Sequence, residues 1–143
     1  CQESGRDQQH TVLGLGALSA ICELAWKQGN DLYSAYENRV LLGYEYTVKY
    51  NLGYDVPFKT WTDVTGKYCK WDVISKRQKI KMEESDTERG KCWQPVFYMV
   101  YNHYVQRKKL SMPYTELLLE TYTEDKYDGG HPSYGPLLFN DLK

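Results

Sequence analysis

The sequence predicts an all-α fold of antiparallel helical hairpins with one long irregular loop. Apolar residues recur every three to four positions over residues 7–28 and again over residues 31–50, which is the spacing of a helix with one buried face. A tight Gly-Asn-Asp turn joins the two stretches. The 143 residues are enough for one domain with a usable hydrophobic core. We therefore expect a single, mainly helical domain.

The first helix is expected over residues 7–28. Asp7 or Ser4 can serve as its N-cap, and Gly29 is suited to end it. Cys22 lies within the apolar stretch and is expected to be buried as a small hydrophobic residue. The stripe that faces the core is expected to consist of Leu13, Ala17, Ile21, Leu24 and Ala25.

The second helix is expected over residues 31–50, with Asp31 as its N-cap. Its buried stripe is expected to contain apolar residues spaced four positions apart, namely Leu32, Tyr36, Val40, Tyr44 and Val48. Two long amphipathic helices joined by a short turn pack against each other as an antiparallel hairpin.

Residues 51–94 lack helical periodicity and are expected to form the long irregular loop. A loop of this length in a compact domain often serves as a lid or a cleft wall. We expect a short strand pair within it, around residues 71–74 and 80–82. Cys69 and Cys92 flank its charged part and could be bridged in an oxidising compartment, although the sequence alone does not establish that bond.

Two shorter helices are expected after the loop, over residues 95–109 and 114–122. Pro95 is suited to the first turn of the earlier one, because a helix leaves the N–H groups of its first turn unpaired. Residues 128–136 are rich in glycine and proline and are expected to form turns.

Charge and cysteine usage argue against several functional classes. The 18 basic and 19 acidic side chains give a net charge of −1, so the composition does not favour nucleic acid or an anionic membrane surface as a partner. No apolar run in the sequence is long enough to span a bilayer. The four cysteines lack the C-x-x-C spacing of zinc sites, and no serine lies in a G-x-S-x-G motif.

Polar and ionisable residues are concentrated in residues 2–11, where the first helix begins. The unpaired N–H groups of a helix N-terminus favour an anionic group. Arg6 can bind a carboxylate through two hydrogen bonds, and His10 can exchange a proton near neutral pH. This segment is therefore a candidate site, and the alternative is a capping segment with a merely exposed histidine.

A second candidate cluster is formed by Tyr98, Tyr101, Asn102, His103 and Tyr104. Tyr101 and His103 are two positions apart, so on a helix they point away from each other and at most one of them faces a given cleft. The alternative interpretation of this cluster is a tyrosine-rich packing face. His131 lies in a Gly-Gly-His-Pro turn, for which a surface position is the alternative to a binding role.

Four segments of the chain together resemble the alginate lyase superfamily, the α/α-toroid polysaccharide lyases. These segments are residues 2–11 (QESGRDQQHT), 31–51, 100–104 (VYNHY) and 131–135 (HPSYG). The resemblance implies a ring of helical hairpins around a cleft, which needs more chain than 143 residues. Residues 1–143 are therefore expected to be the later part of a single catalytic domain, a partial toroid that is unstable or inactive when isolated.

The resemblance implies cleavage of a uronic-acid polymer, alginate-like or glucuronan-like, by β-elimination. This reaction needs a group that neutralises the carboxylate, a base for the C5 proton and an acid for the leaving O4. Gln9 and His10 match the amide–histidine pair beside the carboxylate. Tyr104 matches the catalytic tyrosine, with Tyr101 in reserve. The chemistry requires no metal or other cofactor.

The chain departs from the family pattern at the carboxylate partner. Some members carry an arginine one to two turns before the catalytic tyrosine, where this chain has Phe97 and Tyr98. Arg6 or Arg39 is expected to take that role. Three further residues in the matching segments are expected to contact substrate, namely Asn102, His103 and His131.

The implied partner is an acidic polysaccharide, and the implied location is periplasmic or secreted, with the targeting signal outside this chain. The sequence does not define an oligomeric state. Two other functions stay open. A helical-toroid glycoside hydrolase would need two carboxylates, for which Glu3 and Asp7 are available, and would release saturated sugars. A non-catalytic polysaccharide-binding domain would use the aromatic residues without depending on His10 or Tyr104.

Overall fold

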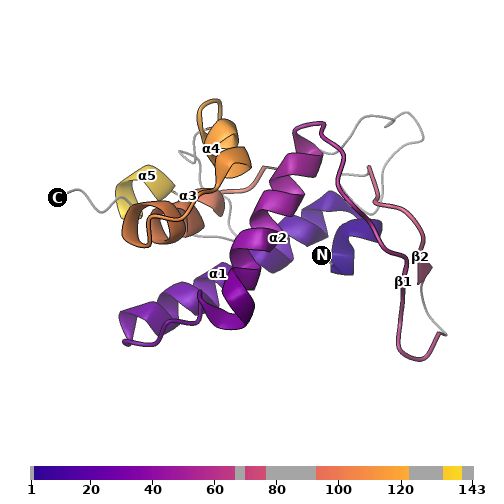
Figure 1. The fold of residues 1–143 in the computed structure, drawn as a ribbon, viewed down its shortest axis with the longest axis horizontal. Helices are drawn as coiled ribbons and strands as arrows, with labels where there is room; N and C mark the ends of the chain where they lie inside the picture. Colours follow the sequence, from indigo (N-terminus) through magenta and orange to yellow (C-terminus); the bar gives the residue numbers. More distant parts are fainter. Residues whose placement is uncertain (1, 67–69, 77–92, 123–133, 140–143) are drawn as a thin grey trace.

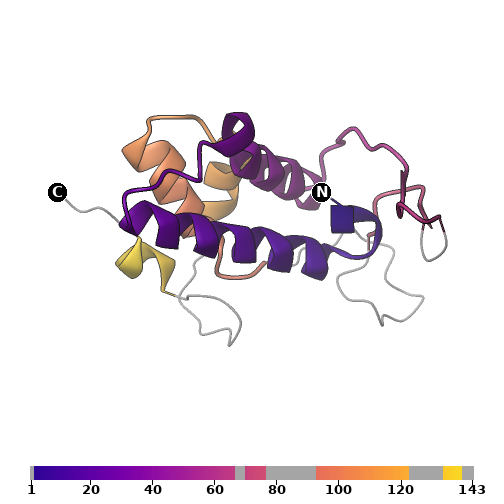
Figure 2. The same cartoon turned by 90° about the horizontal axis from the view of Figure 1, so that it is seen from below.

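The computed structural model describes residues 2–66, 70–76, 93–122 and 134–139. The described chain is mainly helical, as predicted, with one two-residue strand pair (Figures 1 and 2). Its elements in order are the 3₁₀-helix η1 (Gln2–Gly5), α1 (Gln8–Lys27), α2 (Ala35–Asn51), β1 (Trp61–Thr62), β2 (Lys70–Trp71), α3 (Phe97–Tyr101), the π-helix η2 (Asn102–Arg107), α4 (Pro113–Leu119) and α5 (Gly135–Leu138).

The bounds of α1 agree with the predicted helix. Asp7 has an extended backbone and is the N-cap, because its Oδ1 accepts a hydrogen bond from the backbone N–H of His10 at 2.8 Å. Gly29 has a φ of +84°, a value that glycine adopts readily, and the helix ends just before it. Cys22 is buried, with 5% of its surface exposed, as expected.

The predicted core stripe of α1 is wrong. Leu13, Ile21 and Leu24 are 44%, 55% and 64% exposed, and Ala17 is exposed as well. The face that packs inward instead carries Val12, Leu15, Ser19, Cys22 and Glu23. Its two polar members are buried because they have partners, as Ser19 Oγ lies 2.7 Å from the hydroxyl of Tyr44 and Glu23 pairs with Arg107. The apolar stripe read from the sequence therefore lies on the outer face.

α2 runs antiparallel to α1, which confirms the predicted hairpin. Asn51 at the end of α2 donates a hydrogen bond to Gln8 at the start of α1, and Tyr44 meets Ser19 in the middle of both helices. The two helices are in contact with each other, and Figure 1 shows α2 crossing α1 at an angle. Tyr44 and Val48 are fully buried between α1 and the helices that follow.

The expected N-cap at Asp31 is wrong. α2 begins at Ala35, and Asp31 Oδ1 accepts from the N–H of Ser34 in a turn before the helix. The residues at 36–38 have left-handed φ values of 50°, 58° and 59°, so the regular right-handed helix starts at Arg39. This backbone turns Tyr36 outward, where it is 85% exposed. Leu32 is also exposed, so the first half of the predicted stripe lies outside the core.

The core lies where α1, α2, α3, η2 and α4 meet (Figure 1). The hydroxyl of Tyr44 donates to the carbonyl of Val96 at 3.1 Å, which ties α2 to the start of α3. Glu45 ties α2 to α4, because its carboxylate accepts from the backbone N–H groups of Tyr114 and Thr115. These bonds satisfy N–H groups at the start of α4 that would otherwise lack partners.

The later helices differ in detail from the prediction. The expected helix over 95–109 is α3 continued by η2, and it begins at Phe97, two residues after Pro95. The expected helix over 114–122 is α4, which begins at Pro113 and ends at Leu119. Of the tail expected to form turns, residues 134–136 are described, and α5 begins at Gly135 within it.

The irregular loop contains a strand pair, but with a different pairing from the one predicted. β2 pairs antiparallel with β1, with Trp61 opposite Trp71 and Thr62 opposite Lys70. The expected partner at 80–82 lies outside the described residues, as do Cys69 and Cys92, which the sequence suggested could be bridged. The loop returns to the helical body at Ser75, whose N–H donates to the carbonyl of Ser4 at 2.8 Å.

Candidate active site

An aspartate–histidine pair is located at the N-terminal end of α1. Nδ1 of His10 lies 2.8 Å from both carboxylate oxygens of Asp7. Asp7 is fully buried, whereas the side chain of His10 is 28% exposed. An ionised carboxylate only accepts hydrogen bonds, so this contact favours the His10 tautomer in which Nδ1 carries the hydrogen. Nε2 is then the ring nitrogen available to an incoming group.

A buried amide network supports this end of α1. The Gln8 amide nitrogen donates to the carbonyl of Ser75 at 2.8 Å, and its oxygen accepts from Asn51 Nδ2 at 2.8 Å. Asn51 also donates to the carbonyl of Thr47 at 2.9 Å. Gln8 and Asn51 are each only 1% exposed, so these bonds join α1, α2 and the irregular loop in a water-poor environment. These bonds fix the position of the first turn of α1, which carries His10.

Arg6 lies next to this pair, and its side chain is 39% exposed. It contacts Glu3 at 3.4 Å and lies 3.9 Å from Asp7 Oδ2, both long distances for an arginine–carboxylate contact. Its guanidinium can therefore bind an incoming carboxylate. Gln9 is half-buried on the first turn of α1 between Gln8 and His10. The site thus combines a cation, an amide, a helix N-terminus and a partly exposed imidazole.

Tyr104 lies in the core, away from His10. Its side chain is fully buried, and its hydroxyl donates to the backbone carbonyl of Tyr33 at 2.7 Å. Burial raises the pKa of this phenol above its ordinary value. Tyr104 lies near Cys22, and the twelve residues from His10 to Cys22 span about 18 Å along α1. The structure does not bring Tyr104 and His10 together.

His103 is also part of the core. Its ring stacks on Tyr33 with centroids 3.8 Å apart and meets Trp26 edge-on at 4.8 Å. Asn102 is buried as well, with 2% exposed. The resemblance implies that His103 and Asn102 contact substrate. In the structure neither side chain reaches the surface. His131 lies outside the described residues.

Tyr101 faces away from His103, as predicted. Its hydroxyl donates to Glu116 Oε1 at 3.1 Å, and burial together with this carboxylate raises the pKa of the phenol. With Tyr98, Leu119 and Glu120 it lines a hollow of about 280 Å³ between α3 and α4. Its lining carries the carboxylates of Glu116 and Glu120 without an arginine or lysine, whereas Arg6 accompanies the carboxylates beside His10.

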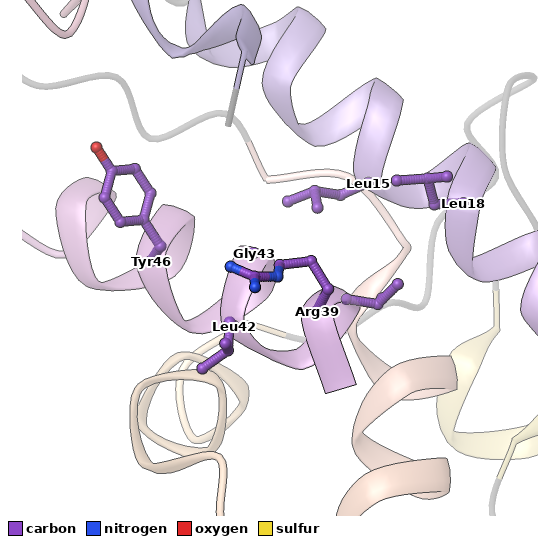
Figure 3. Close-up of a pocket in the computed structure, with 7 residues that line it drawn as sticks. Leu15, Leu18, Arg39, Leu42, Gly43 and Tyr46 are labelled. Carbon is purple, nitrogen blue, oxygen red and sulfur yellow. The ribbon is translucent and has the colours of Figure 1, made fainter. Parts of the chain in front are cut away.

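Arg39 lines a different hollow, of about 340 Å³, between α1 and α2 (Figure 3). Its guanidinium extends between Tyr46 on one side and Leu15 and Leu18 on the other. The lining is mainly apolar and also includes Val40, Leu42 and Gly43. Of the two arginines expected to bind the carboxylate, Arg6 is therefore the one placed beside His10.

The sequence grouped Arg6, Gln9 and His10 as candidate residues, but it did not indicate the contacts that Asp7 and Gln8 make. Asp7 was expected only as a cap or as a hydrolase carboxylate, and its contact with the imidazole ring was not foreseen. A signal was present, because an aspartate three residues before a histidine at a helix start brings the two side chains together. The bonds from Gln8 to Asn51 and Ser75 depend on tertiary packing and had no local signal.

Within the described ranges, no group of three or more histidine, cysteine, aspartate and glutamate side chains is gathered in a way that would hold a metal ion. Among the same residues, no helix has the length and apolar character needed to cross a membrane. Comparison of the chain with protein-family models, with curated proteins and with solved structures found no match.

Changing Tyr104 to Phe is expected to reduce stability rather than turnover. The substitution removes the hydroxyl and leaves the buried carbonyl of Tyr33 without this hydrogen bond, which costs about 1–3 kcal/mol. Urea unfolding of the wild type and of Tyr104→Phe measures this loss. A rate of substrate cleavage reduced by a factor of about 100, with stability unchanged, would instead assign the phenol to the active site, as the resemblance implies.

Acidification is expected to destabilise the protein through His103. The ring is fully buried, and its nitrogens make no hydrogen bonds among the described residues. Burial lowers the pKa of His103 to about 4, although the carboxylates of Asp31 and Glu23 oppose the shift while Arg107 and Lys108 add to it. The unfolded chain takes up this proton near the ordinary pKa of about 6.5. The folded state is therefore penalised as the pH falls through this window.

A single histidine with the folded and unfolded pKa values of His103 lowers the free energy of unfolding by about 2 kcal/mol between pH 7 and pH 5. Urea unfolding of the wild type and of His103→Phe at these two pH values tests the prediction. Phenylalanine keeps a ring stacked on Tyr33 and cannot be protonated, so the variant should lose less stability on acidification. Equal losses in the two proteins would show that His103 is not the responsible group.

Proposed function

We propose that this chain supplies the His10 end of the active site of a polysaccharide lyase that cleaves uronic-acid polymers by β-elimination. The observation that carries the proposal is the Asp7–His10 pair, with a half-exposed Arg6 beside it at a helix N-terminus. This arrangement combines an anion-binding group with a proton acceptor. A uronic acid carries the two matching groups on neighbouring atoms, because its carboxylate is attached to C5, the carbon that loses the proton.

In the proposed reaction, Arg6, Gln9 and the N-terminus of α1 bind the substrate carboxylate and stabilise the charge that develops as C5 loses its proton. Nε2 of His10 accepts that proton. The electron pair of the C5–H bond forms the C4–C5 double bond, and the bond from C4 to O4 breaks. The departing O4 takes a proton, so that one sugar ends in an unsaturated ring and the other in a free hydroxyl.

Two groups are candidates for the proton donor to O4. The resemblance assigns this role to Tyr104, whose hydroxyl is bonded to Tyr33 inside the core. His10 becomes an imidazolium after accepting the C5 proton, and it can return a proton to O4 when both atoms lie on the same side of the sugar ring. The site geometry favours His10, because it is the partly exposed group of the two.

We further propose that the chain is part of an α/α toroid and that the protein is periplasmic or secreted, where it meets acidic polysaccharide. The apolar outer face of α1, formed by Leu13, Ile21 and Leu24, supports the first of these statements. In the described part of the chain these three large apolar side chains are 44–64% exposed, and a further helical hairpin packed there would cover them.

The test is incubation of the complete protein, in which the proposed toroid would surround the cleft, with alginate, glucuronan and pectate, followed by measurement of the ultraviolet absorbance of the released sugars. β-Elimination leaves a C4–C5 double bond that absorbs in the ultraviolet, so absorbance should rise with at least one polymer. New reducing ends without absorbance would indicate the hydrolase alternative. Binding of the polymers without any cleavage would indicate a carbohydrate-binding domain.

A further inference from the structure

We propose that Asp7 is a positioning residue that holds the His10 ring with Nδ1 protonated and Nε2 facing the substrate, an inference that rests on the proposed function. The geometry points to this role because Asp7 makes three contacts with the same residue. Both of its oxygens lie 2.8 Å from His10 Nδ1, and Oδ1 also accepts from the His10 backbone N–H at 2.8 Å. Backbone and ring of His10 are thus fixed by one carboxylate.

The burial of Asp7 also favours its contact with the His10 ring. Its side chain is completely shielded from solvent, so the carboxylate cannot be stabilised by water and depends on protein partners. Arg6 also approaches Asp7, but its Nε lies 3.9 Å from Asp7 Oδ2, a longer distance than the 2.8 Å to the imidazole. A buried carboxylate in this position favours a ring nitrogen that carries a hydrogen, and it disfavours the opposite tautomer, in which two acceptors would face each other.

The arrangement has a direct consequence for proton transfer. With Nδ1 protonated, the lone pair of the neutral ring is on Nε2, and Nε2 is the atom that can take the C5 proton. After transfer the ring carries a positive charge beside the Asp7 carboxylate, which stabilises that charge without taking up the proton itself. Asp7 contacts the ring at Nδ1 and not at Nε2, so it acts through His10 rather than on the reacting atoms.

Asp7 is also the N-cap of α1, so its replacement must keep the cap while changing the contact with the ring. Asn is as good an N-cap as Asp, because its side-chain oxygen can accept from the His10 N–H. Its amide is uncharged and can turn an NH₂ group toward Nδ1, which would place the hydrogen of His10 on Nε2. Asp7→Asn therefore separates the helix cap from the orientation of the ring.

Asp31 provides a matched control. Its Oδ1 accepts from the backbone N–H of Ser34, three residues later, as Asp7 Oδ1 does from His10. Asp31 lies beyond the other end of α1 and makes no contact with His10. Asp31→Asn therefore changes the same functional group in the same local geometry, away from the proposed site, and should leave the rate of cleavage close to that of the wild type.

Two measurements on the full chain test the proposal. The first is nitrogen-15 NMR of the histidine rings, which distinguishes the two neutral tautomers and does not depend on activity. Wild type should show His10 protonated at Nδ1, and Asp7→Asn should lose this preference. The second is the initial rate on a polyuronate that the wild type cleaves, which Asp7→Asn should lower by about 100-fold or more with circular dichroism unchanged.

The outcomes separate this inference from the proposed function. A wild-type His10 protonated at Nε2, or an Asp7→Asn variant with normal tautomer and normal rate, would overturn the role of Asp7. If no polyuronate yields an unsaturated product but the tautomer changes as expected, the lyase proposal fails while the positioning by Asp7 stands. An equal loss of rate in Asp31→Asn would show that the effect is general destabilisation, and it would also overturn the role.

Discussion

Replacing His10 with Gln is expected to lower the initial rate of unsaturated-product formation by about 100-fold or more, within the range for loss of a general base or acid. Gln cannot exchange a proton, so the C5 proton would have no acceptor at this position. Its amide nitrogen can still donate to the carboxylate of Asp7, which avoids leaving a buried charge without a partner. The rate is measured at saturating polyuronate, and circular dichroism confirms that the helices remain.

Lys27→Gln is a suitable control for this experiment, because it introduces the same side chain at the other end of α1 on an exposed position. It should have a near-normal rate. A near-normal rate for His10→Gln would show that the Asp7–His10 pair only supports the helix terminus. In that case the tyrosine assignment from the resemblance, tested by Tyr104→Phe, would be the surviving mechanism.

The start and end of α1 could be predicted from local sequence because capping is a local interaction. Asp7 bonds to an N–H three residues away, and Gly29 relieves the backbone at the C-terminal end. Asp31 has the same capping chemistry, yet it accepts from Ser34 in a turn and the helix begins later. Local sequence thus indicated the type of interaction but not whether a helix would follow it.

The inward face of α1 could not be predicted from apolar periodicity. Ser19 and Glu23 are polar, and a pattern-based reading assigns such residues to the solvent face. Their burial depends on Tyr44, Tyr33 and Arg107, which come from three other segments of the chain. Apolar periodicity describes one helix at a time, so it does not show which polar residues will find partners after folding.

The candidate site shows the same division between local and tertiary information. Arg6, Gln9 and His10 are neighbours in sequence, so their grouping was predictable and the structure keeps it. Tyr104 was grouped with His10 only through the resemblance. Its position depends on the η2 π-helix and on the carbonyl of Tyr33, and both are set by tertiary packing rather than by a local sequence pattern.

Replacing Arg107 with Met is expected to lower the free energy of unfolding by about 3–5 kcal/mol, the loss typical of a buried ion pair that is left with one partner. Arg107 Nη1 and Nη2 contact the Glu23 carboxylate at 3.0 to 3.3 Å. The two side chains are only 16% and 8% exposed. Without Arg107, the buried carboxylate keeps a hydrogen bond from the Tyr33 hydroxyl at 3.2 Å but loses this cation. A loss of this size is a large part of the roughly 5–15 kcal/mol that stabilises a typical domain.

Lys108 is the matched control for this prediction, since it is the adjacent cation and also forms an ion pair. Its Nζ lies 2.7 Å from Asp31 Oδ2, but its side chain is 38% exposed, so Lys108→Met should cost less than about 1 kcal/mol. Urea unfolding of both variants gives the comparison. Adding Glu23→Gln to Arg107→Met should restore part of the lost stability, because the unpaired charge is then removed from the interior. Similar losses for Arg107→Met and Lys108→Met, or no recovery in the double variant, would show that burial of the Glu23 charge does not set the cost.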